Sequence, residues 1–94
     1  MLRRVRIVVR GLVQGVGFRA FILNIARSLG LRGFVKNQLD GSVLIVAEGD
    51  EQALQKLIDA ASRGPPAAIV ENIDIVYEEY RGDLPRFYID YDCP

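Results

Sequence analysis

The hydrophobic period of the sequence changes at one glycine-rich segment, and this change limits the possible folds more than any other feature. Ahead of the segment, Val5, Ile7 and Val9 alternate with other residues, as in a half-buried strand. The segment itself is GLVQGVGFR, residues 11–19. Beyond it, apolar residues recur at helical spacing, at Phe18, Phe21, Ile22, Ile25 and Leu29. A strand, a tight glycine turn and an amphipathic helix are therefore predicted in succession.

A hairpin and a second helix are predicted next. GFVKNQ and SVLIVAEG are predicted strands, and the Asp40-Gly41 pair between them is typical of a tight hairpin turn. The second helix is expected from about Asp50, a candidate N-cap, to Arg63, where the sequence GPP ends it.

Two more apolar alternations, AIVENIDIVYEEY and RFYIDY, predict strands near the end of the chain. The segment EEYRGDLPR, residues 78–86, is expected to be a solvated loop. The order βαββαβ predicts an α+β, ferredoxin-like sandwich, in which a four-stranded antiparallel sheet carries two helices on one face.

Length and charge exclude several classes of partner. A chain of 94 residues is expected to form a single domain. Its 12 basic residues balance 12 acidic ones, which argues against a nucleic-acid or membrane-surface binder. No apolar run has the length of a membrane span, and no signal-peptide pattern opens the sequence.

The side chains available for catalysis are also limited. The sequence has no histidine, which removes histidine acid–base catalysis, histidine-activated nucleophiles and most zinc sites. Its single cysteine, Cys93, cannot form a disulfide within the chain, so nothing requires an oxidising compartment. Carboxylates, amides, guanidinium groups and the backbone remain.

Two nucleotide-related interpretations of the glycine segment fit poorly. Gly15, Gly17 and Ala20 spell G-x-G-x-x-A, with Asp40 about twenty residues further on, as in dinucleotide-binding folds. The predicted hairpin makes two strands antiparallel neighbours, whereas that fold needs parallel strands joined by helices. RNA-binding domains with the βαββαβ order stack bases on aromatic residues of the third strand, and SVLIVAE contains none.

Phosphate binding by the backbone is a third interpretation. A glycine turn at a helix N-terminus directs several N–H groups toward one place, where the helix dipole favours an anion. Arg19 adds a permanently charged donor fork that matches phosphate oxygens. From the fold alone, the favoured reading is a turn that only packs strand against helix, with Arg19 solvated.

Two segments, taken together, favour phosphate binding over a turn that only packs strand against helix. GLVQGVGFR and GFVKNQLDGSVLIVAEG resemble both signature segments of the acylphosphatase family, and their spacing also fits. The resemblance covers residues 1–94 as a single acylphosphatase-like domain. It implies hydrolysis of acyl phosphates, which are carboxyl-phosphate mixed anhydrides, to a carboxylate and inorganic phosphate. It also implies that no metal ion and no organic cofactor take part.

The resemblance implies roles for particular residues as well. It implies that Arg19 is the catalytic arginine and that Asn37 orients the attacking water. It implies a phosphate-binding backbone loop made of Gln14, Gly15, Val16, Gly17, Phe18 and Arg19. The chain departs mildly from the family pattern at Phe34, where tryptophan is frequent, and at Asp90, where a basic residue is common.

A small cytoplasmic, monomeric acylphosphatase is therefore expected, with an acyl phosphate as substrate and inorganic phosphate as product and inhibitor. A non-catalytic sensor of phosphate or acyl phosphate on the same fold is the alternative from another class. The acylphosphatase-like domain of a carbamoyl-transferring hydrogenase maturation protein is a related alternative. We do not expect it, because no zinc or transferase region follows in the 94-residue sequence.

Overall fold

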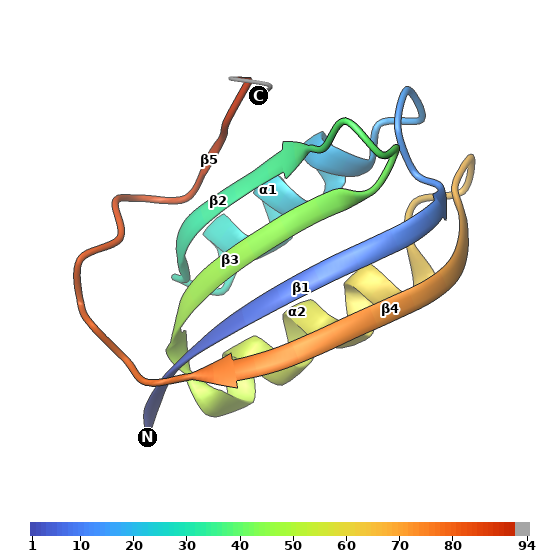
Figure 1. Ribbon diagram of the computed structural model, residues 1–94. Coiled ribbons are helices and arrows are strands. Elements are labelled where there is room, and N and C mark those ends of the chain that lie inside the picture. The colour runs from blue at the N-terminus through green and yellow to red at the C-terminus, as the bar shows by residue number, and fades with distance from the viewer. Residues whose placement is uncertain (92–94) are drawn as a thin grey trace.

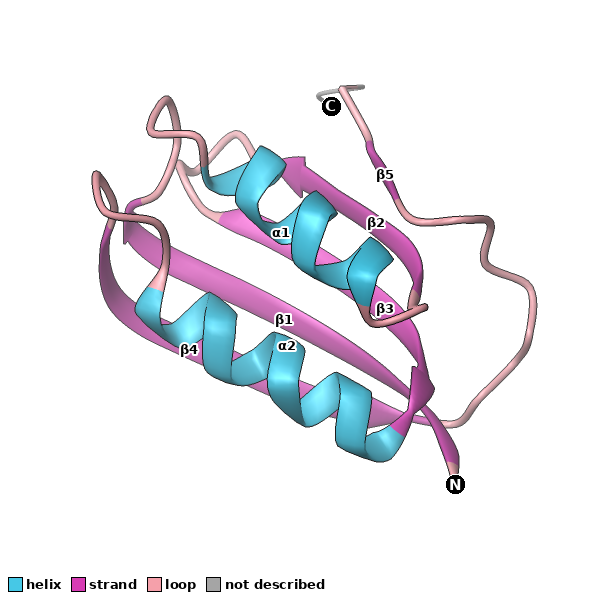
Figure 2. Cartoon of the chain, turned by 180° about the vertical axis from the view of Figure 1, so that it is seen from behind, coloured by secondary structure: helices cyan, strands magenta, loops and turns pink. Residues whose placement is uncertain are grey.

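The computed structural model describes residues 1–91 as a sheet covered by two helices (Figure 1). The lone cysteine, Cys93, lies outside these residues. The elements in chain order are β1 (Leu2–Leu12), α1 (Phe18–Ser28), β2 (Arg32–Asn37), β3 (Val43–Asp50), α2 (Glu51–Arg63), β4 (Ile69–Glu78) and β5 (Tyr88–Ile89). The strand order across the sheet is β4-β1-β3-β2-β5, and both helices cover the same face (Figure 2).

The predicted ferredoxin-like fold is confirmed, with one strand more than expected. β1 pairs antiparallel with β3 and β4, and β2 pairs antiparallel with β3. The fifth strand, β5, pairs in parallel with β2 through Phe34 and Val35, so the sheet is mixed. β5 is parallel because the segment after β4 crosses to the opposite edge and returns to the end of the sheet where β2 begins (Figure 1).

The core lies between the sheet and the helices. Val5, Ile7 and Val9 of β1 are fully buried, as their alternation predicts. They pack with the apolar stripes of the two helices, whose buried members include Phe18, Ile22, Ala26, Leu54, Leu57 and Ala61. Burying each large apolar side chain stabilises the fold by about 1.5–3 kcal/mol. No helix among residues 1–91 is both long and apolar enough to span a membrane.

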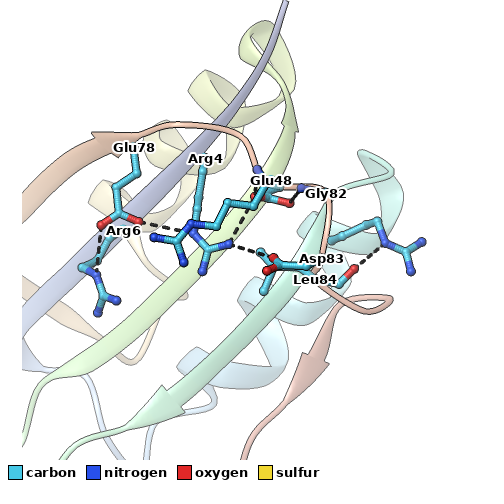
Figure 3. A network of polar contacts seen from close by, with 9 residues as sticks. Arg4, Arg6, Glu48, Glu78, Gly82, Asp83 and Leu84 are labelled. Carbon is cyan, nitrogen blue, oxygen red and sulfur yellow. Dashed lines mark hydrogen bonds and ion pairs between the residues drawn. The ribbon is translucent and has the colours of Figure 1, made fainter.

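A buried carboxylate ties the β4–β5 connection to the opposite face of the sheet (Figure 3). Glu48 is 2% exposed, and its carboxylate accepts hydrogen bonds from the backbone N–H groups of Arg81 and Gly82 at 2.8 and 3.1 Å. Arg4 pairs with Glu48 at 3.2 Å and with Asp83 at 3.3 Å. The segment predicted to be a solvated loop is therefore anchored, and it delivers β5 to the edge of β2.

Gly33 in β2 provides a test of the close packing between β2 and β3. Its φ is +141°, and a Cβ at this position would overlap the carbonyl oxygen of Val46. We expect Gly33→Ala to destabilise the fold by at least about 1–3 kcal/mol, the cost of backbone strain alone. Urea denaturation measures this loss.

The control is Gly30→Ala. Gly30 also has a positive φ, +70°, but beyond its chain neighbours no atom lies within 4 Å of the place that a Cβ would take. Only the left-handed backbone penalty of about 1–2 kcal/mol applies there, without the overlap. Equal losses in the two variants would contradict the close approach of β2 to β3.

Candidate active site

The loop between β1 and α1 leaves a set of backbone donors without partners. Gly15 and Gly17 adopt φ values of +75° and +79°, a left-handed conformation that glycine adopts without steric cost. Gly17 is the N-cap of α1, and neither a capping side chain nor an acidic residue occupies the first turn. Within residues 1–91, no backbone N–H from residue 15 to residue 20 donates a hydrogen bond. These N–H groups are therefore available to an anion at the positive end of the helix dipole.

The side chain of Gln14 fixes this loop against the turn between β2 and β3. Its Nε2 donates hydrogen bonds to the carbonyl oxygens of Gln38 at 2.8 Å and Ser42 at 2.9 Å. Figure 1 shows the two segments side by side, in blue and green at one end of the sheet. Because Asn37 immediately precedes this turn, the two bonds set its position relative to the loop.

The β2–β3 turn is itself held by a polar network around Ser42, which is 2% exposed. The Ser42 hydroxyl donates to Asp40 at 2.6 Å and accepts from Gln38 Nε2 at 2.9 Å. The Asp40 carboxylate also accepts hydrogen bonds from the Ser42 N–H and, at 3.0 Å, from the Arg10 guanidinium. Hydrogen bonds from the Ser42 hydroxyl, the Ser42 N–H and Arg10 lower the pKa of Asp40 from 3.8 to about 2.

Arg19 lies in the first turn of α1 with its guanidinium over the ring of Tyr91, 5.1 Å from the ring centroid. This distance falls within the range of a cation–π contact. Among residues 1–91, no carboxylate forms an ion pair with Arg19. Its planar donor fork is thus held in place by a ring and not by an ion pair within the described chain.

Asn37 is the last residue of β2 and carries an unusual acceptor. Its side-chain Oδ1 is buried and has no hydrogen-bond partner among the described residues. A buried polar atom left unpaired costs about 1–3 kcal/mol. A donor that enters from solvent would relieve this cost.

The structure brings most of the predicted site residues to two cavities that share Arg19 and Tyr91. Gln14, Arg19 and Asn37 line a cavity of about 270 Å³, with Leu39, Asp90 and Tyr91 at its side. A neighbouring cavity of about 130 Å³ is lined by residues that include Gly15, Gly17, Phe18 and Arg19.

Two predicted loop residues direct their side chains elsewhere. Val16 lines neither cavity and packs against the hydrophobic core. The Phe18 side chain is 1% exposed in that core, so only its backbone is available to a ligand in the loop. Both positions can therefore contribute N–H groups, as the backbone-loop prediction requires.

Sequence reasoning missed the contact of Tyr91 with Arg19 and the bridging bonds of Gln14. The alternation of Phe87, Ile89 and Tyr91 contained a signal, because it predicts that all three side chains share one face of the last strand. No sequence pattern pointed to the Gln14 side chain, since its partners are backbone carbonyls 24 and 28 residues away.

Comparisons with a family model and with known sequences point to the same family. The acylphosphatase family model matches residues 5–89. An acylphosphatase of Caldivirga maquilingensis is 50% identical over 92 residues, covering 95% of each chain.

Solved structures agree with this match. The crystal structure of the acylphosphatase from Bacillus subtilis has a TM-score of 0.91 and 44% identity, covering 97% of this chain and all of that one. Full-length HypF, solved in a phosphate- and nucleotide-bound form, has a TM-score of 0.89 and 30% identity. This chain covers only 12% of HypF. From its sequence and its fold, the chain belongs to the acylphosphatase family.

Proposed function

We propose that this chain hydrolyses acyl phosphates by direct attack of a water molecule on phosphorus, without a covalent intermediate. One observation carries the proposal: Arg19 and Asn37, from different elements, line one cavity beside the uncapped N-terminus of α1. The substrate has a carboxylate leaving group, so the reaction needs mainly positioning and charge stabilisation. Arginine, amide and backbone groups supply both.

The phosphoryl group of the substrate binds at the loop from Gln14 to Arg19. The free backbone N–H groups and the dipole of α1 receive its oxygens, and the Arg19 guanidinium binds two of them as a fork. The contact with Tyr91 restricts the Arg19 side chain before the substrate arrives. Arg19 therefore acts on both the bound substrate and the transition state.

Asn37 orients the attacking water. Its buried Oδ1 accepts a hydrogen bond from a water O–H, which gives this acceptor the donor that the described chain does not provide. The water oxygen bonds to phosphorus as the bond from phosphorus to the acyl oxygen breaks. The acyl group leaves as a carboxylate, and a phosphate oxygen takes the proton of the water, giving inorganic phosphate.

Residues 1–94 act, in this proposed function, as one domain and as a monomer in the cytoplasm. The balance of 12 basic and 12 acidic residues supports a small-molecule substrate over a nucleic acid or a membrane surface. The single cysteine supports a compartment in which disulfides are not required.

The division of roles between Arg19 and Asn37 is testable by substitution. Arg19→Ala should weaken phosphate inhibition and turnover together, and Arg19→Lys should restore little, because an ammonium lacks the bidentate fork. Asn37→Ala should lower turnover by about a hundred- to a thousand-fold, the scale of one preorganised polar group. Phosphate inhibition should be almost unchanged in that variant.

Steady-state kinetics and phosphate inhibition constants of the folded variants measure both effects. Asn24→Ala and Arg63→Ala are the matched controls, because both residues are exposed helix positions that do not line these cavities. If Asn37→Ala lost phosphate binding but kept its turnover at saturation, the assignment would be wrong.

Activity is expected to need no metal ion. Among residues 1–91, no group of three His, Cys, Asp or Glu side chains is placed to hold one. Phosphate release from a synthetic aryl acyl phosphate should therefore continue unchanged in excess chelator. Release that depends on added magnesium or zinc would contradict the mechanism, and phosphate binding without any release would identify a sensor.

The ionised carboxylate of Asp40 should stabilise the fold. Its pKa is about 2 in the folded protein, below the ordinary value of 3.8. The stabilisation is therefore present above pH 3.8 and is lost as the pH falls from 3.8 through about 2. Asp40→Asn should be less stable than the unchanged protein at neutral pH, and the difference should shrink over this interval. Urea denaturation across a pH series measures it, and a difference that persists undiminished at pH 2 would refute the assignment.

A further inference from the structure

A separate cavity lies where α1 ends and β2 begins, far from the candidate active site. It has a volume of about 270 Å³ and is lined by Arg27, Gly30, Leu31, Arg32 and Arg86. Arg27 is in the last turn of α1, whereas Arg19 is in the first. Arg32 begins β2, whereas Asn37 ends it (Figure 1). An eleven-residue helix is about 16 Å long, so the two sites are distinct.

Two of the three arginines are held in place by the segment that leads into β5. Arg27 Nε donates to the carbonyl oxygen of Phe87 at 2.9 Å, and Arg32 Nε donates to that of Leu84 at 2.7 Å. Each guanidinium uses one of its five N–H donors in this way. Within the described part of the chain, the terminal nitrogen atoms of both groups form no hydrogen bond or ion pair, so a ligand can bind them.

The arrangement places like charges together. Arg32 and Arg86 are directly opposite each other in an antiparallel bridge. Like charges in directly opposed positions destabilise a sheet, and an arginine cannot lose its charge in a protein. Within residues 1–91, no carboxylate forms an ion pair with Arg27, Arg32 or Arg86.

The arginines of β1 differ from these three in their partners. Arg3, Arg4, Arg6 and Arg10 of β1 all form ion pairs with carboxylates. The sequence has 12 acidic and 12 basic residues. A shortage of acidic residues therefore does not explain why these three arginines have no carboxylate partner among residues 1–91. Three permanent positive charges around one cavity match a ligand that brings several negative charges of its own.

We propose that the cavity of Arg27, Arg32 and Arg86 is a second anion site, which binds a small molecule carrying a di- or polyphosphate group. Guanidinium forks match phosphate oxygens in pairs, and three of them match a group with more than two negative charges. The cavity is as large as the one that Arg19 and Asn37 share, which suits a small ligand. Binding in this cavity does not depend on hydrolysis at the other site.

Inorganic pyrophosphate is the probe. It would be titrated into isotope-labelled protein carrying Arg19→Ala, which weakens the loop site, at constant ionic strength. Nuclear magnetic resonance would follow the Nε signals of Arg27, Arg32 and Arg86 and the amides of Gly30 and Leu31. We expect saturable shifts at these signals, and acetate should bind at least about tenfold more weakly because it carries one charge.

Arg86→Gln is the second variant, because the Arg86 side chain makes no hydrogen bond or ion pair with the other described residues. It should weaken pyrophosphate binding by about tenfold or more, the effect of losing one charge-assisted contact. It should leave hydrolysis of an aryl acyl phosphate unchanged. The matched control, Arg63→Gln, removes an arginine that also has no carboxylate partner among residues 1–91 but does not line the cavity.

Three results would overturn the proposal. The first is a set of resonance shifts that grow linearly with the pyrophosphate concentration and never saturate. The second is shifts confined to residues 15–19 in the unchanged protein. The third is an equal loss of affinity in Arg63→Gln and Arg86→Gln, which would mean that pyrophosphate responds only to net charge.

Discussion

The side-chain amide of Gln14 joins the two segments on which the candidate active site depends. One segment carries the unpaired N–H groups and leads into Arg19, and the other carries Asn37. Gln14 makes these contacts from the β1–α1 loop to the β2–β3 turn, and neither of these connections is a helix or a strand, so the sheet and helices alone do not fix the distance between them. The two carbonyl oxygens that Gln14 reaches, on Gln38 and Ser42, supply that constraint. Preorganisation of this kind is what phosphoryl transfer without a side-chain base requires.

A second constraint reaches the same site from the opposite face of the sheet. Glu48 is buried with Arg4 and holds the backbone of Arg81 and Gly82. The anchored segment sets β5 beside β2, and β5 leads to the ring on which Arg19 rests. Removing one partner of a buried ion pair costs about 3–5 kcal/mol, because the other charge is left without compensation. The position of Arg19 in the candidate active site thus depends on a carboxylate that it does not touch.

The parts of this structure that sequence predicts are those that local patterns encode. Helix stripes follow from spacing, and the predicted N-cap of α2 is confirmed by the bond from the Gln52 N–H to Asp50. The alternation in RFYIDY predicts a last strand, but its parallel pairing with β2 was not predicted, because alternation does not say which strand is the neighbour or in which direction it runs. The burial of Glu48 was also hidden, since Arg4 and Glu48 alternate with core residues as exposed charges would. Their partners lie 33 to 79 positions away along the chain, where no local pattern reaches.

The inner position of β1 in the sheet, between β4 and β3, governs when the protein can fold. β1 is made first, yet its two neighbours are β3 and β4, and its Arg4 is paired with Glu78. Closing such a long loop costs chain entropy before the contacts reward it, so folding is slowed by the topology and not by any single residue. During synthesis on the ribosome, the apolar side of β1 stays unpaired with its neighbouring strands until most of the chain has been made. The sheet can therefore close only after β4 has emerged.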